Sequence, residues 1–423
     1  MEELEEPDLD IQTQMILLAS ANHDLETLRT LFKTASANVQ DEETLVTPLH
    51  AAIAACEDDS PDGTANGHGH SNTDVDSSAA PEHGESSPAA KTLRLLFQNG
   101  AVWNDLDANN ETPGCMAWRL GLKDLYEIII DAGVRAELLL NRLDEYQMLL
   151  GADDDDEDDE EEDEVVEAEV DGEVPDGVTS ISLQDSVNPS SNNEAYLSSQ
   201  IPSATTTTNL LDSSSNAIMM TWETPIMEEH AKELLPREGM RVLNIGHGLG
   251  IFDGIVQKYR PASHHIIEAH PDVVERMKAA GWCSESENEN ARPGVTVHQG
   301  RWQDVVPQLV SDIQDGREQK FDAIYFDTFA ESYSDFKKFI GLVQDLLASG
   351  GKFSMFWGAG ADRRSSYDVY TKILEMDLFE EGFDVTWQSI PIPDLQQAGE
   401  WEGITRPYWT LNVYKLPTCT LAD

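Results

Sequence analysis

The sequence has little positive charge and few cysteines. Of its 423 residues, 27 are Lys or Arg against 80 Asp or Glu, which gives a formal net charge of -53. Such a field repels nucleic acid and anionic membranes, so we expect neither as a direct ligand and instead expect a basic protein partner. The four cysteines lie far apart without metal-ligand spacing, which argues against a disulfide framework and against a bound metal.

Long apolar runs are also missing. No run approaches the roughly 20 residues that a membrane-spanning helix needs. The first ten residues, MEELEEPDLD, have neither the apolar core of a signal peptide nor the basic pattern of a transit peptide. We therefore expect a cytoplasmic location, with a nuclear pool left open.

Two similar segments occur in the first 150 residues. TPLHAAIAAC at 47–56 and ETPGCMAWRLGLKDLYEIIIDAGV at 111–134 both begin with Thr-Pro and continue as a short helix with small inner residues. Removing the Asp-, Ser-, Gly- and His-rich stretch at about 58–90 leaves them about one ankyrin period apart, roughly 33 residues. We predict an all-α ankyrin-like repeat domain at 1–150, with a disordered insertion at 58–90, that docks protein partners.

A strongly acidic segment follows this region. Residues 153–164 read DDDDEDDEEEDE, and the chain stays polar to about residue 190. Such a run repels itself and cannot form a core, so we predict a disordered linker at 151–190. A solubilising spacer and a surface that attracts a Lys- and Arg-rich partner explain it equally well.

From about residue 191 the pattern becomes that of an α/β protein. Apolar runs of strand length alternate with amphipathic helices, and they lie at 241–246, 264–269, 295–300, 321–328, 351–358, 383–389 and 408–414. Strands separated by helices favour a doubly wound parallel sheet, and the last two are expected to pair antiparallel. A seven-stranded Rossmann-like sheet with one reversed strand at its end is typical of class I S-adenosylmethionine-dependent methyltransferases. We predict this domain at 191–423.

The segment NIGHGLG joins the first of these strands to a helix. Its glycines, Gly246, Gly248 and Gly250, let the backbone turn sharply and approach a ligand closely. A dinucleotide fingerprint has its third glycine one position later, where Ile251 stands, so the motif favours adenosylmethionine over NAD. A tight turn without a ligand is the alternative.

Residues after the next two strands strengthen the cofactor interpretation. Glu268 ends the second strand, where an acid accepts the ribose hydroxyls of a nucleotide, and Arg301 and Trp302 follow the third strand, where the adenine should stack. Ordinary core packing is the alternative for Trp302. In this topology all these segments reach the carboxyl ends of the strands, where ligands bind.

Two acids are not explained by local structure. In TWETPIM, Pro225 suits the first turn of a helix and Thr224 its N-cap, but nothing there requires Glu223. Asp327 leaves the apolar strand FDAIYF at its carboxyl end. Two carboxylates beside a methyl donor suit a guanidinium, whose N–H groups form a planar fork. They would hold this poor nucleophile, polarise it and take up its proton.

The motifs WETPIM, VLNIGHGLGI, HHIIEAHPDV, GRWQDV and FDAIYFDTF, in this order, resemble guanidinoacetate methyltransferase. Together with an ankyrin-like front end they resemble the fungal type IV protein arginine N-methyltransferases. That resemblance implies methylation of the delta (N5) nitrogen of arginine in a basic large-subunit ribosomal protein, with Glu223 and Asp327 holding the guanidinium. It implies cofactor contacts at Tyr196, Met219, Met227, Gly246, His247, Gly248, Leu249, Gly250, Ile251, Phe252, Glu268, Ala269, His270, Arg301, Trp302 and Asp327, with Tyr196 closing over the site.

Three alternatives follow from the same residues. The loop after Asp327 carries Glu331 alone, whereas the commoner arginine methyltransferases have two glutamates on one hairpin, so methylation of the terminal nitrogens is not favoured. A methyltransferase for a small guanidino compound such as guanidinoacetate is a second possibility, although a repeat module would be superfluous there. A non-catalytic acidic ankyrin adaptor is the third, against which the intact set of glycines and acids argues.

Overall fold

The computed structural model describes residues 9–57, 87–150, 193–201, 209–212, 214–283, 292 and 294–422. The chain forms two compact units: one comprises Met1–Val178 with Arg363–Ile373, the other Thr179–Asp362 with Leu374–Asp423. The predicted linker at 151–190 and nearly all of the predicted insertion at 58–90 lie outside the described residues. No helix within the described ranges is both long and apolar enough to cross a membrane.

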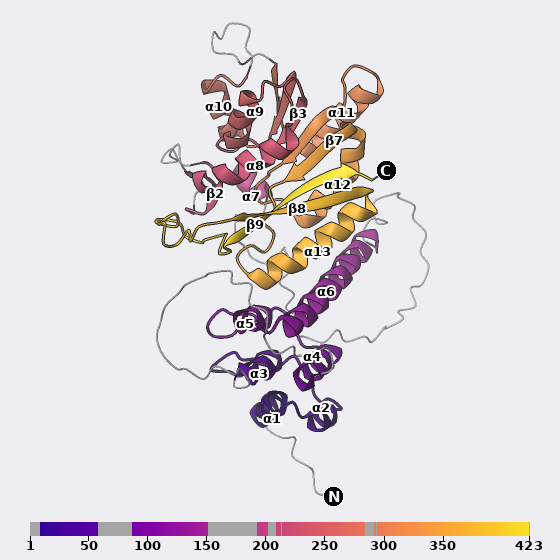
Figure 1. The fold of residues 1–423 in the computed structure, drawn as a ribbon, viewed down its shortest axis with the longest axis vertical. Coiled ribbons are helices and arrows are strands. Elements are labelled where there is room, and N and C mark those ends of the chain that lie inside the picture. The colour runs from indigo at the N-terminus through magenta and orange to yellow at the C-terminus, as the bar shows by residue number, and fades with distance from the viewer. Residues whose placement is uncertain are drawn as a thin grey trace, which may run out of the picture. The chain divides into compact units, whose positions relative to one another are not determined.

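Helices build the first unit (Figure 1). They are α1 (Leu9–Ala21), α2 (Leu25–Leu31), α3 (Pro48–Ala54), α4 (Pro88–Gln98), α5 (Pro113–Arg119) and α6 (Lys123–Leu150). The two Thr-Pro pairs start equivalent helices, because Thr47 caps α3 and Thr112 caps α5, each accepting a backbone N–H three residues ahead. The helical content is as predicted, and α4 begins at Pro88, within the expected insertion. The ankyrin class itself stays a prediction.

A later segment also belongs to the first unit. Residues 363–373, which we expected within the domain at 191–423, form the start of helix α13 (Arg364–Glu380) and cluster with α5 and α6. The Thr112 and Ser365 hydroxyl oxygens are 2.8 Å apart, and the Tyr126 hydroxyl donates to Asp368 Oδ2 at 2.5 Å. Tertiary contacts of this kind leave no break in composition, which is why the sequence did not indicate them.

The second unit is built on a seven-stranded sheet in the order β5-β4-β3-β6-β7-β9-β8. The strands are β3 (Arg241–Ile245), β4 (Ser263–Glu268), β5 (Val295–Gln299), β6 (Phe321–Phe326), β7 (Leu347–Met355), β8 (Phe383–Pro391) and β9 (Val413–Leu421). The strands from β5 to β7 are parallel, and β9 runs antiparallel to both β7 and β8. The mostly parallel sheet and its antiparallel final pair are therefore confirmed.

Two details of the last strands differ from expectation. The reversed strand β9 lies between β7 and β8, so it is not at the edge of the sheet. It begins at Val413, whereas we placed it at 408–414, and Pro417 lies inside it opposite Trp387. A proline within an apolar run argues against a strand, because it lacks the N–H that a ladder uses, and this concealed β9 in the sequence.

Helices cover both faces of the sheet (Figure 1). They are α8 (Thr224–Leu234), α9 (Ile251–Lys258), α10 (Pro271–Ala279), α11 (Trp302–Gln314) and α12 (Tyr333–Leu346), together with the later part of α13. The short elements α7 (Asn193–Ser198), β1 (Asn209–Leu211), β2 (Ala217–Met220) and the 3-10 turn η3 (Thr221–Glu223) precede them. The apolar faces of α8, α9 and α10 pack on β3, β4 and β6 and form one core cluster, which fixes the strand ends where the site lies.

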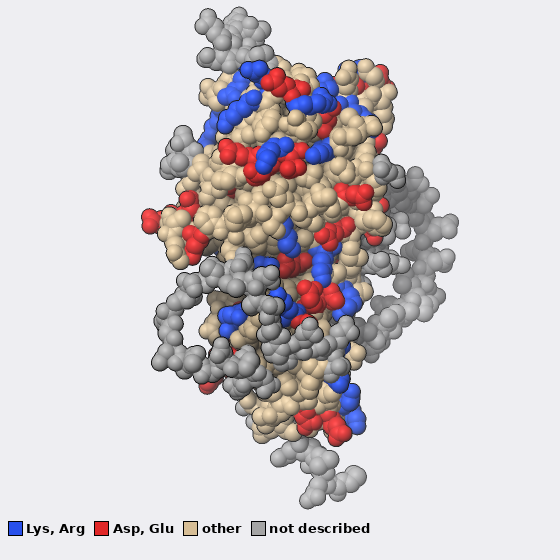
Figure 2. Space-filling view, in the orientation of Figure 1, with Lys and Arg blue, Asp and Glu red and all other residues tan. Residues whose placement is uncertain are grey.

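Charged side chains of both signs are interspersed on the face shown in Figure 2. The twelve consecutive acids at 153–164 lie outside the described residues. These twelve acids alone contribute -12 to the net charge of -53.

Candidate active site

The glycine loop after β3 is pressed against the end of β6. Gly246, Gly248 and Gly250 have φ angles of 92°, 54° and 72°, in the left-handed region that only glycine adopts easily. A Cβ atom on Gly246 would lie 1.9 Å from the backbone oxygen of Asp327, so no other residue fits there. The Asp327 N–H in turn donates to the Ile245 carbonyl oxygen at 2.8 Å. The loop and Asp327 are thus immediate neighbours, as their places at adjacent strand ends predicted.

Glu268, at the end of β4, fastens the loop from the other side. Its Oε2 accepts the backbone N–H of His247 at 2.8 Å and of Gly248 at 3.4 Å, and its Oε1 accepts the N–H of His270 at 2.7 Å. The carboxylate also lines a cavity beside the loop. A carboxylate has about four lone-pair positions, so Glu268 can hold the loop and accept a ligand hydroxyl as well.

This first cavity has a volume of about 70 Å³. Its walls include many of the residues predicted to contact the cofactor: Tyr196, Met219, Gly246, Gly248, Glu268, Ala269, Arg301, Trp302 and Asp327. They come from α7, β2, the glycine loop, and the ends of β4, β5 and β6. The structure therefore brings together segments that the sequence placed at the carboxyl edge of the sheet.

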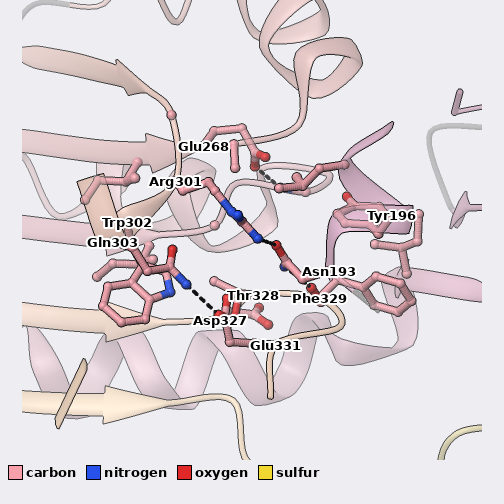
Figure 3. A pocket seen from close by; sticks show the side chains of 18 of the residues that line it. Asn193, Tyr196, Glu268, Arg301, Trp302, Gln303, Asp327, Thr328, Phe329 and Glu331 are labelled. Atoms are coloured by element: carbon pink, nitrogen blue, oxygen red, sulfur yellow. Dashed lines mark hydrogen bonds between the residues drawn. The ribbon is translucent and has the colours of Figure 1, made fainter. Parts of the chain in front are cut away.

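Asn193 and Tyr196 of helix α7 line the first cavity (Figure 3). Arg301 donates to Asn193 Oδ1 at 2.9 Å, and Asn193 donates to the Phe329 carbonyl oxygen at 3.2 Å. The Tyr196 ring centroid lies 4.8 Å from that of His270 and 5.0 Å from that of Phe329. Tyr196 is therefore held at the cavity, where the predicted closing residue should be.

Other predicted contact residues support the cavity from behind. Met227 is fully buried in the core, and the Phe252 ring stacks on Tyr325 with centroids 3.9 Å apart. The His247 side chain turns inward, with Nδ1 2.6 Å from Asp253 Oδ2. The structure does not bring the following predicted residues to the cavity wall: Met227, His247, Leu249, Gly250, Ile251, Phe252 and His270.

A second cavity, of about 310 Å³, adjoins the first. Glu223 and Asp327 both line it, although they are far apart in the sequence. Its aromatic wall consists of Phe326, Phe329, Tyr333, Phe336, Phe356, Trp357 and Tyr408. The two cavities share Ile218, Asp327, Thr328, Phe329 and Glu331. Asp327 therefore stands at their junction, and Glu223 faces it from within the second cavity.

The backbone around Glu223 differs from the prediction. Helix α8 begins at Thr224, whose φ and ψ of -51° and -46° are helical, and Glu223 is its N-cap residue, so the predicted N-cap at Thr224 is wrong. The cause is the 3-10 turn Thr221–Glu223, which runs directly into the helix and gives the Thr224 N–H a partner at the Thr221 carbonyl oxygen. Pro225 does lie in the first turn, as predicted. Glu223 instead reaches back and accepts the Met220 N–H at 3.2 Å.

The pKa values of Glu223 and Asp327 are both raised to near neutral pH. Burial, with a contribution from the negative charge of Asp327, raises the pKa of Glu223 to about 8. Burial, with a contribution from Asp253, raises the pKa of Asp327 to about 7. Within the described part of the chain, Asp327 Oδ2 is buried and has no hydrogen-bond partner. Acids with this environment favour a bound cation, because a positive charge restores the stabilisation that burial removed.

Some residues of the site carried no clear signal in the sequence. Tyr408 donates its hydroxyl hydrogen to Glu223 from the long connection between β8 and β9, which we interpreted as part of a strand. Glu331 lines both cavities and accepts the Gln303 amide at 2.9 Å. Among the described residues, no group of three or more His, Cys, Asp or Glu is placed to hold a metal.

This chain is similar to known methyltransferases. The profile of guanidinoacetate N-methyltransferase matches residues 196–374, which include most residues that line the two cavities. Protein arginine N-methyltransferase 2 of Aspergillus fumigatus is 48% identical over 98% of this chain and 97% of its own length. The protein of the same name from Aspergillus oryzae is 49% identical over 99% and 98%, and that from Emericella nidulans 46% over 99% and 99%. The chain belongs to the fungal protein arginine N-methyltransferase 2 family.

Proposed function

We propose that the protein transfers a methyl group from S-adenosylmethionine to an arginine side chain of a protein substrate. The observation that carries this proposal is the placement of Glu223 and Asp327 in one cavity that adjoins the cavity beside the glycine loop. The names of the relatives, which are protein arginine N-methyltransferases, agree with it.

The first cavity suits the adenosyl part of the methyl donor. Its floor is a glycine loop that packs closely on Met219, since a Cβ on Gly248 would lie 2.8 Å from that side chain. Glu268 offers carboxylate oxygens to the ribose, and Trp302 offers a ring to the adenine. Asp327 Oδ2, buried and unpaired within the described residues, marks the end nearest the second cavity. A sulfonium there supplies an electrophilic methyl group.

The second cavity suits the arginine. The carboxylates of Glu223 and Asp327 accept the N–H fork of a guanidinium, and the aromatic wall stacks on its plane. The attacking nitrogen forms a bond to the methyl carbon as the carbon–sulfur bond breaks, and that nitrogen releases one proton. An ionised carboxylate accepts the proton, and its raised pKa suits that role. Alignment of donor and acceptor supplies much of the rate, on the order of several kcal/mol.

The lining favours a protein arginine over a small guanidino acid. The described residues around the second cavity include Glu223, Asp327 and Glu331 but no Lys, Arg or His. The carboxylate of guanidinoacetate would find no cationic partner there and three acids to repel it. An arginine within a peptide brings no such charge, and the helical first unit provides a surface on which its protein can dock.

We propose further which nitrogen of the arginine is methylated and which kind of protein carries it. Resemblance to the fungal type IV enzymes supports the delta (N5) nitrogen, and the single Glu331 after Asp327 agrees with it. The net charge of -53 supports a basic substrate, for which we propose a large-subunit ribosomal protein. Electrostatic attraction of this kind raises the rate of encounter and weakens at high salt.

The test is methyl transfer by the full chain from labelled S-adenosylmethionine, with a ribosomal protein extract and guanidinoacetate as rival substrates. We expect label in protein, with mass spectrometric fragments of internally methylated arginine. Glu223→Gln and Asp327→Asn should each reduce transfer at least 100-fold while cofactor affinity, measured by calorimetry, changes no more than a few-fold. Glu228→Gln, an exposed residue of α8, is the control. Label confined to guanidinoacetate, or normal turnover in both variants, refutes the proposal.

A further inference from the structure

The connection between β8 and β9 carries Tyr408 into the second cavity, and it is anchored on both sides of that residue. The Thr405 N–H donates to the Ser215 carbonyl oxygen at 3.1 Å, and the Thr410 N–H donates to the Ala361 carbonyl oxygen at 3.1 Å. Both anchors join the connection to segments beside the cavity. They restrict where the Tyr408 ring can stand.

The Tyr408 ring packs against the residue that precedes Glu223. Its centroid lies 5.9 Å from that of Trp222 and 5.1 Å from that of Trp401, the latter at an edge-to-face angle of 77°. Trp222 also contacts Trp409, with ring centroids 6.0 Å apart. Aromatic contacts of this geometry are favourable and directional. They couple the position of Tyr408 to the turn that holds Glu223.

The hydrogen bonds of Glu223 are divided unequally between its oxygens. The Tyr408 hydroxyl donates to Oε1, and the Met220 N–H donates to the same atom at 3.2 Å. Both protein donors therefore fix Oε1, and Oε2 is the oxygen left for a ligand in the cavity. A bidentate guanidinium contact depends on the plane of the carboxylate, so fixing one oxygen orients the other.

We propose that Tyr408 is a positioning residue for methyl transfer, which holds Oε1 of Glu223 so that Oε2 meets the guanidinium of the substrate. This inference rests on the proposed function. Tyr408 does not touch the reacting atoms; it acts through Glu223. No sequence motif indicated it, and the assignment comes from the anchored connection, the aromatic contacts and the shared oxygen.

The hydroxyl of Tyr408 also influences when Glu223 ionises. Its hydrogen bond lowers the pKa of Glu223 against the larger upward effects of burial and of Asp327. The titratable groups that face Glu223 are Asp327 after β6, Tyr325 on β6 and Tyr408 itself. Loss of the hydroxyl should therefore keep Glu223 protonated to a higher pH. A purely structural role would not produce this effect.

The test compares Tyr408→Phe with the wild-type full chain, using labelled S-adenosylmethionine and a ribosomal protein extract. We expect kcat/KM for the protein substrate at pH 7 to fall about 10- to 100-fold, the size of a lost hydrogen bond to a charged group. The acid limb of the pH profile should move to higher pH, with S-adenosylmethionine affinity unchanged. Tyr126→Phe is the matched control, because it also removes a hydroxyl that donates to a carboxylate, at 2.5 Å, and should leave the acid limb in place.

The outcomes separate this inference from the proposed function. Absence of transfer by the wild-type chain refutes the function, whereas an active wild type with an unmoved acid limb in Tyr408→Phe refutes only the role of Tyr408. If Tyr408→Phe does not bind S-adenosylmethionine, Thr405→Val is measured instead, because it removes the hydroxyl that donates to the Ser214 carbonyl oxygen at 2.7 Å. A shift of the limb in the same direction is expected there, and its absence refutes the inference.

Discussion

Replacing Glu223 by glutamine should stabilise the ligand-free protein above neutral pH. Glu223 is 3% exposed, and burial raises its pKa from 4.5 to about 8. Between those two values the folded chain keeps a proton that the unfolded chain has lost. Stability therefore falls as pH rises from 4.5 and stops falling above 8, because proton binding then no longer differs between the two states. A glutamine side chain does not ionise, so the variant lacks this loss.

The size of the effect follows from the shift. Each pKa unit corresponds to about 1.4 kcal/mol, so this group removes about 5 kcal/mol of stability between pH 4.5 and 8. Asp327 contributes a loss of the same sign in both proteins, since burial raises its pKa to about 7. The difference between wild type and Glu223→Gln therefore contains the loss due to Glu223 together with its interaction with Asp327. It should be near zero at pH 4.5 and grow to about 5 kcal/mol at pH 8.

Scanning calorimetry from pH 5 to 9 measures this difference. Because the chain has two compact units, the relevant transition is the one that S-adenosylmethionine shifts upward. At pH 8 the variant should melt roughly 10–20 °C above the wild type, with a much smaller difference at pH 5. Glu228→Gln changes an exposed carboxylate of the same helix and should follow the wild type. Equal melting temperatures at pH 8 would show that Glu223 ionises freely in the folded protein, contrary to its burial.

Two further predictions concern catalysis and the cofactor. The kcat/KM for the protein substrate should rise with pH and reach a plateau above pH 8. Below pH 7, a plot of log kcat/KM against pH should have a slope of about two, because carboxyl groups with pKa values of about 7 and about 8 must both lose a proton to hold a cation. Initial rates from pH 6 to 9 measure this, and a flat profile contradicts it. Gly246→Ala should weaken S-adenosylmethionine binding at least tenfold in calorimetry, because the new Cβ would lie 1.9 Å from the Asp327 carbonyl oxygen. Gly239→Ala, at a similar φ of 75° but with nothing within 4 Å, should leave the affinity unchanged, and equal affinities in the two variants would contradict the packing of the loop on β6.

The parts of the site that lie at strand ends could be predicted from the sequence. In an α/β sheet, the carboxyl ends of parallel strands share one edge, so Gly246, Glu268 and Asp327 were expected to meet once the strands were assigned. Glu223 was found by elimination, because helix initiation accounts for Pro225 but not for an acid before it. Its exact backbone could not be predicted, since a 3-10 turn and a capped helix start favour similar residues.

Other features depend on tertiary contacts that leave no periodic signal. Tyr408 reaches the cavity from a long connection whose following strand contains Pro417. The segment at 363–373 joins the first unit through single polar contacts such as that between Thr112 and Ser365. Phe252 follows the glycine loop closely but turns into the core, because a helix presents successive residues about 100° apart. The positions of these residues are determined by tertiary packing and not by the local sequence pattern.

The raised pKa values also bear on why the site should select arginine over lysine. Above pH 8 both acids are ionised and the empty cavity holds two buried negative charges, so any cation that enters is bound strongly. An ammonium offers three donors from a single centre and is itself deprotonated more readily when buried. A guanidinium keeps its charge throughout this range and spreads five donors over a plane, so it can serve Glu223 and Asp327 together and stack on the aromatic wall. Burial of these two acids costs the empty site stability. An arginine side chain restores most of it, because its guanidinium can bind both carboxylates at once.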